Sequence, residues 1–373
     1  MPPASRSLPP VPKGFRSTPI RYIPLFLSPS ESTFQTVETN PSHSAPSASD
    51  DAFASDAHFS SLRAAADDIR EEMHRLLVGQ HRMVDLLLAA LLADGHVLIQ
   101  GVPGTAKTLT ARLLARTLDV DFTRIQFTPD LMPSDILGTS VFHPDESTFA
   151  FRKGPIFSNV VLIDEINRAP AKTQAALFEV MEERQVSAEG ETFALDEPFL
   201  VIATQNPLEH EGTYRLPEAQ LDRFLFMIEV DYPSLEEETD ILAAHHAGRT
   251  AKNLDAVESV LGAETLAEHR AQVAAEVHVE DAILDYIARL AQATRDHAAL
   301  SLGASPRASV MLLRTAKAWA ALDGRGYVTP DDIRAVASSA LRHRLLLAPE
   351  EEMEGRSVDN LIERIFDQVD VPR

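Results

Sequence analysis

Hydrophobic residues recur along the chain with two different spacings. Just after residue 58 they follow one another at steps of three or four, the spacing of one face of an α-helix: Leu62, Ala66, Ile69, Met73 and Leu76. A second helical stretch is expected over residues 82–93. The next run, His96-Val97-Leu98-Ile99-Gln100, is flanked by Gly95 and Gly101 and predicts a short buried strand.

Similar apolar runs return between helical stretches and indicate the fold class. They cover residues 160–163, 199–203 and 224–230, and a helical pattern over residues 172–183 separates the first two. Strands that are apolar along their whole length and alternate with helices are typical of a parallel sheet covered on both faces. The sequence therefore predicts an α/β domain over residues 58–231.

After Pro233 the pattern is helical only. Helices are expected over residues 236–247, 281–296, 307–322, 330–342 and 359–369. One of them begins with Thr329-Pro330-Asp331-Asp332, which offers a capping hydroxyl, a proline in the first turn and acids beside the helix N-terminus. We therefore expect a second, all-helical domain over residues 232–373.

Residues 1–57 show no sustained period and are rich in proline and serine. Such a segment buries too little apolar surface to offset the entropy lost on ordering, so a disordered arm is expected. Basic residues precede a short apolar piece at residues 23–27, which loosely imitates a signal peptide. Because Pro24 interrupts this piece, we do not expect secretion.

Charge and composition narrow the class of partner. The chain has 56 acidic and 34 basic residues among 373, and its formal net charge of −22 argues against non-specific binding of nucleic acid. It has no cysteine, which excludes disulfides and fits the cytoplasm. No apolar run reaches the roughly 18 residues of a membrane span, and the histidines lack metal-ligand spacing. Direct insertion into a membrane is not expected.

A glycine-rich stretch follows the first predicted strand and precedes a helix expected over residues 109–118. It reads Gly101-Val102-Pro103-Gly104-Thr105-Ala106-Lys107-Thr108. In a P-loop, glycines let backbone N–H groups surround phosphates at a helix N-terminus, and the predicted nucleotide contacts run from Gly101 to Leu109. Lys107 would contact the β- and γ-phosphates, and Thr108 would bind Mg²⁺. A glycine-rich turn without a ligand is the alternative.

The usual glycine before the lysine is Ala106 in this chain. Only a positive φ demands glycine, so an alanine is tolerable if the backbone is already helical at this position.

Polar residues follow two later strands. Asp164 and Glu165 end the apolar run at residues 160–163; Asp164 is expected to hold the Mg²⁺ shell and Glu165 to orient the attacking water. Asn206 ends the next run and is expected to hydrogen-bond the γ-phosphate or the water, because carboxyl ends of parallel strands face the ligand crevice. Each motif taken alone has an alternative without a ligand. Apolar strands often end in Asp, and Asn206-Pro207 also fits a turn with no role in binding.

Together these stretches resemble the AAA+ ATPases, and more narrowly the MoxR family, over residues 60–347. The resemblance is carried by residues 101–108, 163–169, 203–207, 216–224 and 303–309. It implies an AAA+ α/β domain with a parallel sheet between helices, a small helical lid domain, and ATP hydrolysis with Mg²⁺. Ala106 is a P-loop variant of the kind seen in that family.

The resemblance also assigns residues that the pattern alone leaves open. Val78, Gly79 and Gln80 resemble a stretch that lines the adenine pocket. Arg223 matches the arginine finger that reaches the γ-phosphate of a neighbouring subunit, and Arg307 matches the sensor arginine of the lid. Without the resemblance, both would be interpreted as surface arginines. A finger that acts on a neighbour implies a homo-oligomeric ring, expected to be a hexamer.

A hairpin is predicted around the turn-prone stretch His143-Pro144-Asp145-Glu146, between Val141-Phe142 and Phe149-Ala150-Phe151. It resembles an insert that related ATPases direct into the ring pore or towards a client. A hairpin that merely packs on its own domain is the alternative.

At the level of biology, the resemblance implies an ATP-driven, chaperone-like factor that remodels, assembles or matures the metal cofactor of a protein client. It also implies a separate partner with a von Willebrand factor A domain. The named alternative is a magnesium-chelatase-like motor subunit. A nucleic-acid motor fits less well because the chain lacks a basic stripe, and a switch that binds without hydrolysis fits less well because Glu165, Asn206 and Arg223 are present.

Overall fold

The computed structural model describes residues 48–145, 147–188, 190–206, 214, 216–249 and 251–372, which belong to one compact unit of the chain. The predicted disordered arm lies mostly outside these residues. Helix α1 (Ala48–His74) begins within the predicted arm, nine residues before its expected end at residue 57.

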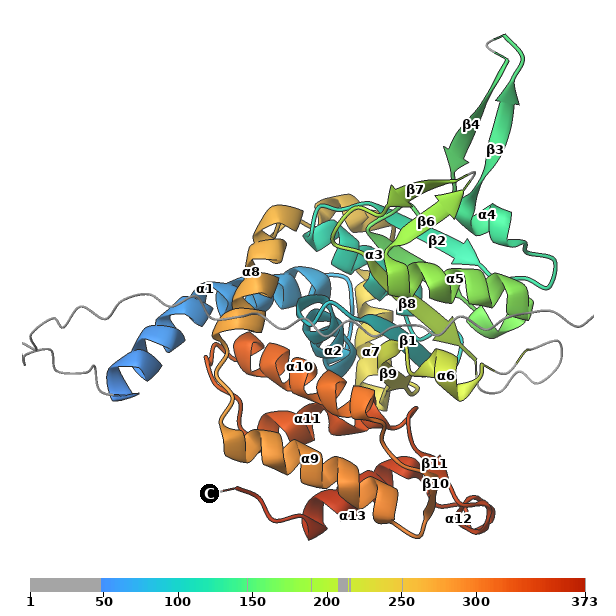
Figure 1. The fold of residues 1–373 in the computed structure, drawn as a ribbon. Coiled ribbons are helices and arrows are strands. Elements are labelled where there is room, and N and C mark those ends of the chain that lie inside the picture. Colours follow the sequence, from blue (N-terminus) through green and yellow to red (C-terminus); the bar gives the residue numbers. More distant parts are fainter. Residues whose placement is uncertain are drawn as a thin grey trace, which may run out of the picture. The chain divides into compact units, whose positions relative to one another are not determined.

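A five-stranded parallel sheet forms the centre of the fold, in the order β2-β5-β8-β1-β9 (Figure 1). The strands are β1 (His96–Gly101), β2 (Phe122–Gln126), β5 (Val160–Asp164), β8 (Leu200–Gln205) and β9 (Phe224–Val230). Four of them were predicted. The edge strand β2 was not, because of its five side chains only Ile125 is buried and no apolar run marks it.

Helices cover both faces of this sheet, as predicted for continuously apolar strands. Val97 and Ile99 of β1 pack in one core with α1, α2 (His81–Leu92) and α3 (Lys107–Thr117). Leu98 points to the other core, which α5 (Ala171–Glu183) closes through Leu177 and Phe178. Short helices α4 (Pro133–Leu137), α6 (Glu218–Leu221) and the 3-10 helix η1 (Ile166–Arg168) complete this part.

Two hairpins extend from the α/β part. The predicted hairpin is confirmed as β3 (Gly138–His143) and β4 (Thr148–Lys153), and it projects away from the body (Figure 1). At its outer end Phe142 and Phe149 contact each other with ring centroids 5.1 Å apart, and the two side chains are largely exposed. A second hairpin, β6 (Gln185–Ala188) with β7 (Glu191–Ala194), was not predicted.

The part after β9 is almost entirely helical. Its helices are α7 (Leu235–His246), η2 (Ala251–Ala256), α8 (Ala263–Glu276), α9 (Asp281–Asp296), α10 (Pro306–Leu322), α11 (Pro330–Leu341), α12 (Pro349–Met353) and α13 (Val358–Gln368). The prediction of helices alone was wrong in one detail, since β10 (Leu300–Leu302) and β11 (Leu346–Leu347) pair in antiparallel fashion. They are too short to give a strand pattern. The predicted cap at Thr329 is present, with a reciprocal bond to Asp332.

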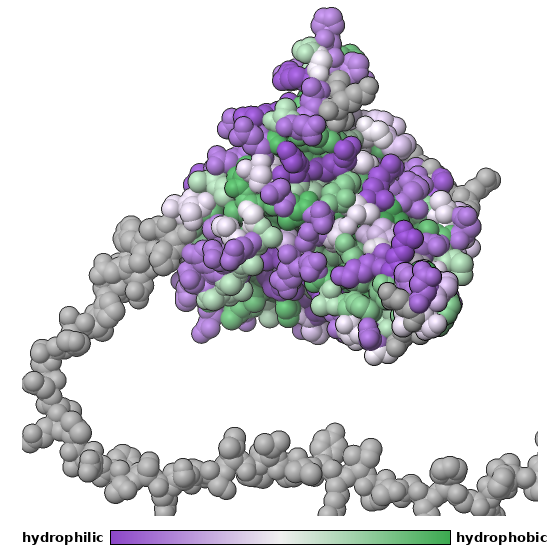
Figure 2. All heavy atoms as spheres, turned by 90° about the horizontal axis from the view of Figure 1, so that it is seen from above, coloured by the Kyte–Doolittle hydropathy of each residue, from purple (hydrophilic) through white to green (hydrophobic). Residues whose placement is uncertain are grey.

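Helix α7 differs from the others in its exposure. Of its twelve residues only Ala244 is buried, while Leu235 and Leu242 are 84% and 68% exposed. On the face that Figure 2 shows, hydrophilic and hydrophobic side chains are interspersed. Within the described residues no helix is long and apolar enough to cross a membrane, and no group of three His, Asp or Glu side chains is arranged to hold a metal ion.

His96 joins three elements at the amino end of β1. It is 4% exposed; its Nε2–H donates to the carbonyl of Met181 at the end of α5, 3.1 Å away, and its Nδ1 accepts from the Val201 N–H of β8 at 3.0 Å. Burial, reinforced by nearby Arg184, lowers the pKa of His96 to about 4. The native state therefore keeps this imidazole neutral.

This burial predicts a specific loss of stability in mild acid. An unfolded His96 takes up a proton near pH 6.5, whereas the native one does so only near pH 4, so stability falls as the pH falls through that window. Between pH 7 and pH 4 the free energy of unfolding should fall by up to about 3 kcal/mol more in the native sequence than in His96→Asn. Denaturant titrations at each pH measure this difference. Parallel profiles for the two proteins would contradict it.

Candidate nucleotide site

The glycine-rich loop lies between the end of β1 and the start of α3, as predicted. Gly104 has φ +88°, and a Cβ built there would meet no atom within 4 Å, so the loop leaves open space at that point. The Lys107 Nζ donates to the carbonyls of Gly101 at 2.8 Å and Val102 at 2.7 Å. Partial burial lowers the pKa of Lys107, and Asp164 opposes that shift. The loop thus combines an ammonium group with a helix N-terminus and leaves open space beside Gly104, which suits a phosphate chain.

The expectation about Ala106 was wrong. Its backbone is left-handed, with φ +59°, and not helical, so the position is one that favours glycine. An L-residue in this conformation loses about 1–2 kcal/mol relative to the right-handed one. Ala106 nevertheless caps α3, because its carbonyl accepts the Thr110 N–H at 2.9 Å. The contacts around the loop therefore hold Ala106 in this unfavourable backbone conformation.

Asp164 ends β5 in the centre of a polar network and is 8% exposed. Its Oδ2 accepts from Arg124 Nε at 2.5 Å, and its Oδ1 accepts from the hydroxyl of Thr204 at 3.0 Å. The same hydroxyl accepts the backbone N–H of Glu165 at 3.0 Å. Thr204 therefore fixes both acids relative to the end of β8.

Glu165 is held in the left-handed region with φ +58°, which turns its side chain out of the strand direction. Its Oε2 accepts from Gln126 Nε2 at 2.7 Å and is paired with Arg168 Nε at 3.2 Å. Asn206 follows β8 at the same edge of the sheet and is half-buried. The ends of β1, β5 and β8 are neighbours in register, so they bring together the predicted Lys107, Asp164, Glu165 and Asn206.

The residues predicted at the adenine pocket form the turn between α1 and α2. Gly79 and Gln80 both have positive φ, at +64° and +60°. A Cβ on Gly79 would lie 2.3 Å from a carboxylate oxygen of Glu237, so this turn packs tightly against α7. The turn from Val78 to Gln80 therefore favours glycine at its centre because of the positive φ, since the Glu237 side chain could move away from an added Cβ.

The two predicted arginines lie at the other end of the sheet. Arg223 immediately precedes Phe224, which pairs with His96 at the first position of β1, whereas Lys107 lies beyond the last position, Gly101. Six residues of strand span about 20 Å. The structure thus does not bring Arg223 to Lys107 within one chain.

Arg307 belongs to the same end as Arg223. Its Nη2 lies 3.0 Å from Glu182 Oε2, and Arg223 Nε lies 3.9 Å from the same oxygen. The hydrogen bond from Arg307 and the positive charges of Arg307 and Arg223 lower the pKa of Glu182. Arg223 also donates to the carbonyl of Phe178. One carboxylate therefore holds two guanidinium groups as a pair.

Comparisons with known proteins fit this geometry. The model of the ATPase family associated with various cellular activities (AAA) matches residues 96–226, and the AAA lid domain matches residues 292–365. The chain is 43% identical to "Chaperone MoxR1" of Mycobacterium tuberculosis over 90% of this chain and 88% of that protein. It is 32% identical to "Protein MoxR" of Paracoccus denitrificans over 85% of this chain and 99% of that protein.

The chain belongs to the MoxR family of AAA+ ATPases. A crystal structure of a candidate ATPase from Cytophaga hutchinsonii agrees with this assignment, with a TM-score of 0.78 and 40% identity over 87% of this chain and 99% of that one. The predicted fold class, an AAA+ domain with a parallel sheet followed by a helical lid, is thereby confirmed.

Within this MoxR-family fold, sequence reasoning missed several polar residues around the predicted acids. Arg124, Gln126 and Thr204 contact the two carboxylates directly. Arg124 and Gln126 lie on the unpredicted strand β2. Thr204 lies in the stretch 203–207 that carries the family resemblance, and its position just before the end of β8 was a usable signal.

Removal of the Thr204 hydroxyl tests the network in this MoxR-family site. In Thr204→Val the Asp164 carboxylate and the Glu165 N–H each lose a partner, so stability should fall by about 1–3 kcal/mol. Turnover of ATP should fall as well, because Glu165 loses its anchor. Thr204→Ser keeps the hydroxyl and is the matched control. Thermal unfolding and steady-state phosphate release measure the two effects, and equal turnover in the two variants would contradict the role.

Proposed function

We propose that this MoxR-family protein hydrolyses ATP with Mg²⁺ at the loop that carries Lys107. The observation that carries the proposal is the convergence of Lys107, Asp164, Glu165 and Asn206 at one edge of the sheet. The open space beside Gly104 and the Asp164 carboxylate near the lysine fit a phosphate chain with its cation. Lys107 would hold the β- and γ-phosphates, and the Thr108 hydroxyl and Asp164 would hold Mg²⁺, which neutralises charge on the phosphates.

The remaining residues would position the water that attacks the γ-phosphate. Glu165 is aimed by the Thr204 hydroxyl, which accepts its backbone N–H, and by Gln126 and Arg168 at its carboxylate. As a base it would take a proton from the attacking water, and Asn206 would orient that water or the γ-phosphate. Val78, Gly79 and Gln80 would line the adenine pocket beside α7.

We further propose that the complete site is shared between two subunits of a ring, most simply a hexamer. Arg223 and Arg307 lie at the end of the sheet opposite Lys107, so both would serve the nucleotide of a neighbour. The exposed apolar residues of α7 support the same assembly. A twelve-residue helix that buries one residue has little tertiary packing of its own, and a neighbouring subunit would supply it.

For the biological role we propose ATP-driven remodelling or assembly of a protein client, including maturation of a metal cofactor, together with a separate von Willebrand factor A domain protein. The chaperone named MoxR1, which shares 43% identity with the chain, supports this direction. The projecting hairpin supplies exposed Phe142 and Phe149 as a contact surface for the client.

The shared site predicts a specific defect in Arg223→Ala. The variant should bind ATP as well as the native protein, because its own loop is intact, but turnover should fall by about 10³-fold when the γ-phosphate loses the guanidinium. Equilibrium binding of a fluorescent ATP analogue and steady-state turnover separate the two effects. Arg356→Ala removes a surface arginine that pairs with Glu351 and Glu354, and serves as the control. Full turnover in Arg223→Ala would refute the proposal.

The client proposal is tested by capture with Glu165→Gln. This variant keeps the phosphate loop but lacks the base, so it should hold ATP and retain its client. Lys107→Ala, which lacks the main phosphate contact, should release the client and is the control. Affinity isolation in the presence of Mg²⁺ and ATP, followed by mass spectrometry, measures the difference. Recovery of nucleic acid in place of a specific protein would contradict a chaperone-like role.

A further inference from the structure

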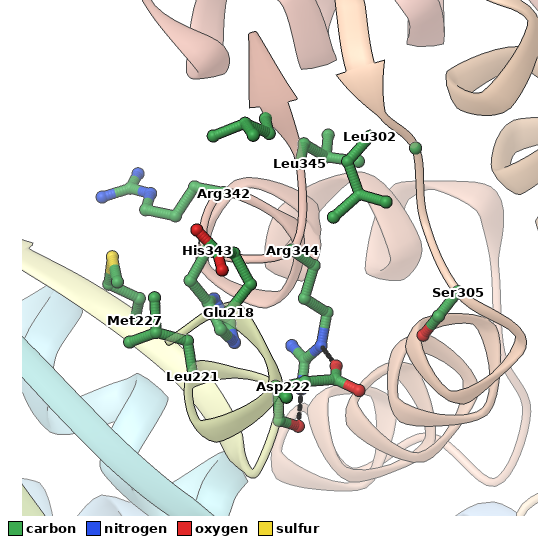
Figure 3. Close-up of a pocket in the computed structure, with 13 residues that line it drawn as sticks. Glu218, Leu221, Asp222, Met227, Leu302, Ser305, Arg342, His343, Arg344 and Leu345 are labelled. Carbon is green, nitrogen blue, oxygen red and sulfur yellow. Dashed lines mark hydrogen bonds and ion pairs between the residues drawn. The ribbon is translucent and has the colours of Figure 1, made fainter. Parts of the chain in front are cut away.

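Arg344 is the most completely buried arginine side chain among those with an ion pair in the described residues, at 2% exposure. It lies between α11 and β11 in the helical part, and its side chain reaches back to the start of β9 (Figure 3). Its Nε lies 2.6 Å from Asp222 Oδ1. Its Nη2 donates to the carbonyls of Asp222 at 3.1 Å and Phe224 at 2.6 Å, and its Nη1 donates to those of Leu225 at 3.1 Å and Ala340. Three of these backbone acceptors flank Arg223.

His343 adds a second contact to the same segment. It is 7% exposed, and burial followed by the charge of Arg344 holds its pKa well below its usual range, so the ring is neutral. Its Nε2–H donates to the Phe224 carbonyl at 2.9 Å. Two consecutive residues of the helical part thus bind the carbonyl that follows Arg223.

The segment around Arg223 is held on its other side by the bond from Arg223 to the Phe178 carbonyl and by the buried ring of Phe224, which contacts Phe178. The ladder between β1 and β9 is irregular between His96 and Val97, where Phe224 enters the sheet. A cavity of about 350 Å³ borders the segment, with Asp222, Leu302, Ser305 and Arg344 in its wall (Figure 3). The cavity leaves the Asp222 side of the segment unpacked, and on this side the hydrogen bonds from His343 and Arg344 hold the backbone carbonyls.

The ion pairs continue from Arg344 to both arginines of the proposed shared site. Asp222 accepts from Arg344 and lies 4.0 Å from Arg307 Nε, and Arg307 shares Glu182 with Arg223. A buried guanidinium is desolvated at a high energetic cost, and it is retained here with five acceptors. Arg334, in contrast, pairs with Glu363 and Asp367 at the surface of the helical part, and within the described residues it has no ion pair with the segment around Arg223.

We propose that Arg344 is a positioning residue for Arg223, which rests on the proposed function in which Arg223 acts on the nucleotide of a neighbour. The helical part of each subunit sets the place of the guanidinium that the subunit offers to the next one. Loss of Arg344 therefore impairs hydrolysis in the neighbouring site and leaves the loop at Lys107 of its own subunit intact.

The experiment compares Arg344→Met with Arg334→Met as the matched control. In Arg344→Met we expect kcat to fall by about 100-fold, the effect of a displacement of about 1 Å in a catalytic group, while the Kd for a fluorescent ATP analogue and the assembled mass stay within about twofold. Arg334→Met should keep the native kcat. Equal kcat in the two variants would overturn the proposal.

Mixed rings distinguish a positioning role from general damage. Arg344→Met subunits keep a working loop but misplace Arg223, and Lys107→Ala subunits lack a working loop but place Arg223 correctly. An equal mixture should regain roughly a quarter of the native turnover per subunit, since half of the loops work and half of their neighbours supply the arginine. The control is a mixture of Arg223→Ala with Lys107→Ala subunits, which should recover turnover in the same way. If this control recovers turnover and the mixture of Arg344→Met with Lys107→Ala does not, Arg344→Met has a structural defect and the proposal is overturned.

Two further variants separate a failure of this proposal from a failure of the shared site. If Arg344→Met does not fold, Asp222→Asn weakens the same contact at a partly exposed carboxylate and should lower kcat by about tenfold, with the same recovery in mixed rings. Native turnover in Asp222→Asn would overturn the proposal. Full turnover in Arg223→Ala would refute the shared site itself, and that result is independent of any Arg344 variant.

Discussion

The pairing of β1 with a parallel strand on each side is the constraint on which the rest of the structure depends. Hydrogen bonds to β8 and β9 fix β1 within the plane of the sheet, and the apolar cores on both faces of the sheet keep it from moving out of that plane. One end of the strand becomes the loop of Lys107, and the other end is tied by His96 to α5 and β8. Because the strand is rigid, the two ends keep their distance. The separation of Lys107 from Arg223, and with it the proposed need for a neighbour, follows from this pairing.

The sequence revealed this frame because burial on both faces of a strand demands continuous apolar residues. Such runs marked β1, β5, β8 and β9. The polar residues after β5 and β8 marked Asp164, Glu165 and Asn206, and the glycine-rich stretch after β1 marked Lys107. Strand β2 lacked the signal because most of its side chains are not buried. Arg124 and Gln126 were missed with it. Contacts made by an edge strand depend on three-dimensional register, and a single sequence contains little information about that.

Other features were hidden because they depend on backbone conformation or on residues distant in sequence. The positive φ at Ala106 could not be read from an alanine, which is unusual in that region. The link from Arg344 to Asp222 joins residues more than a hundred positions apart. Arg223 and Arg307 were found through the resemblance to a family, and their place opposite Lys107 was visible only in the fold.

The hairpin of β3 and β4 acquires a different meaning once the chain is repeated around a ring. Each copy presents a small apolar surface that includes Phe142 and Phe149, and one such surface would bind a client weakly. Symmetry would place several identical tips within reach of one extended client, so that release from one tip leaves the client at a high effective concentration for the next. The affinity for the client would then come from avidity. Each single contact could remain weak enough to be broken in every cycle of nucleotide turnover.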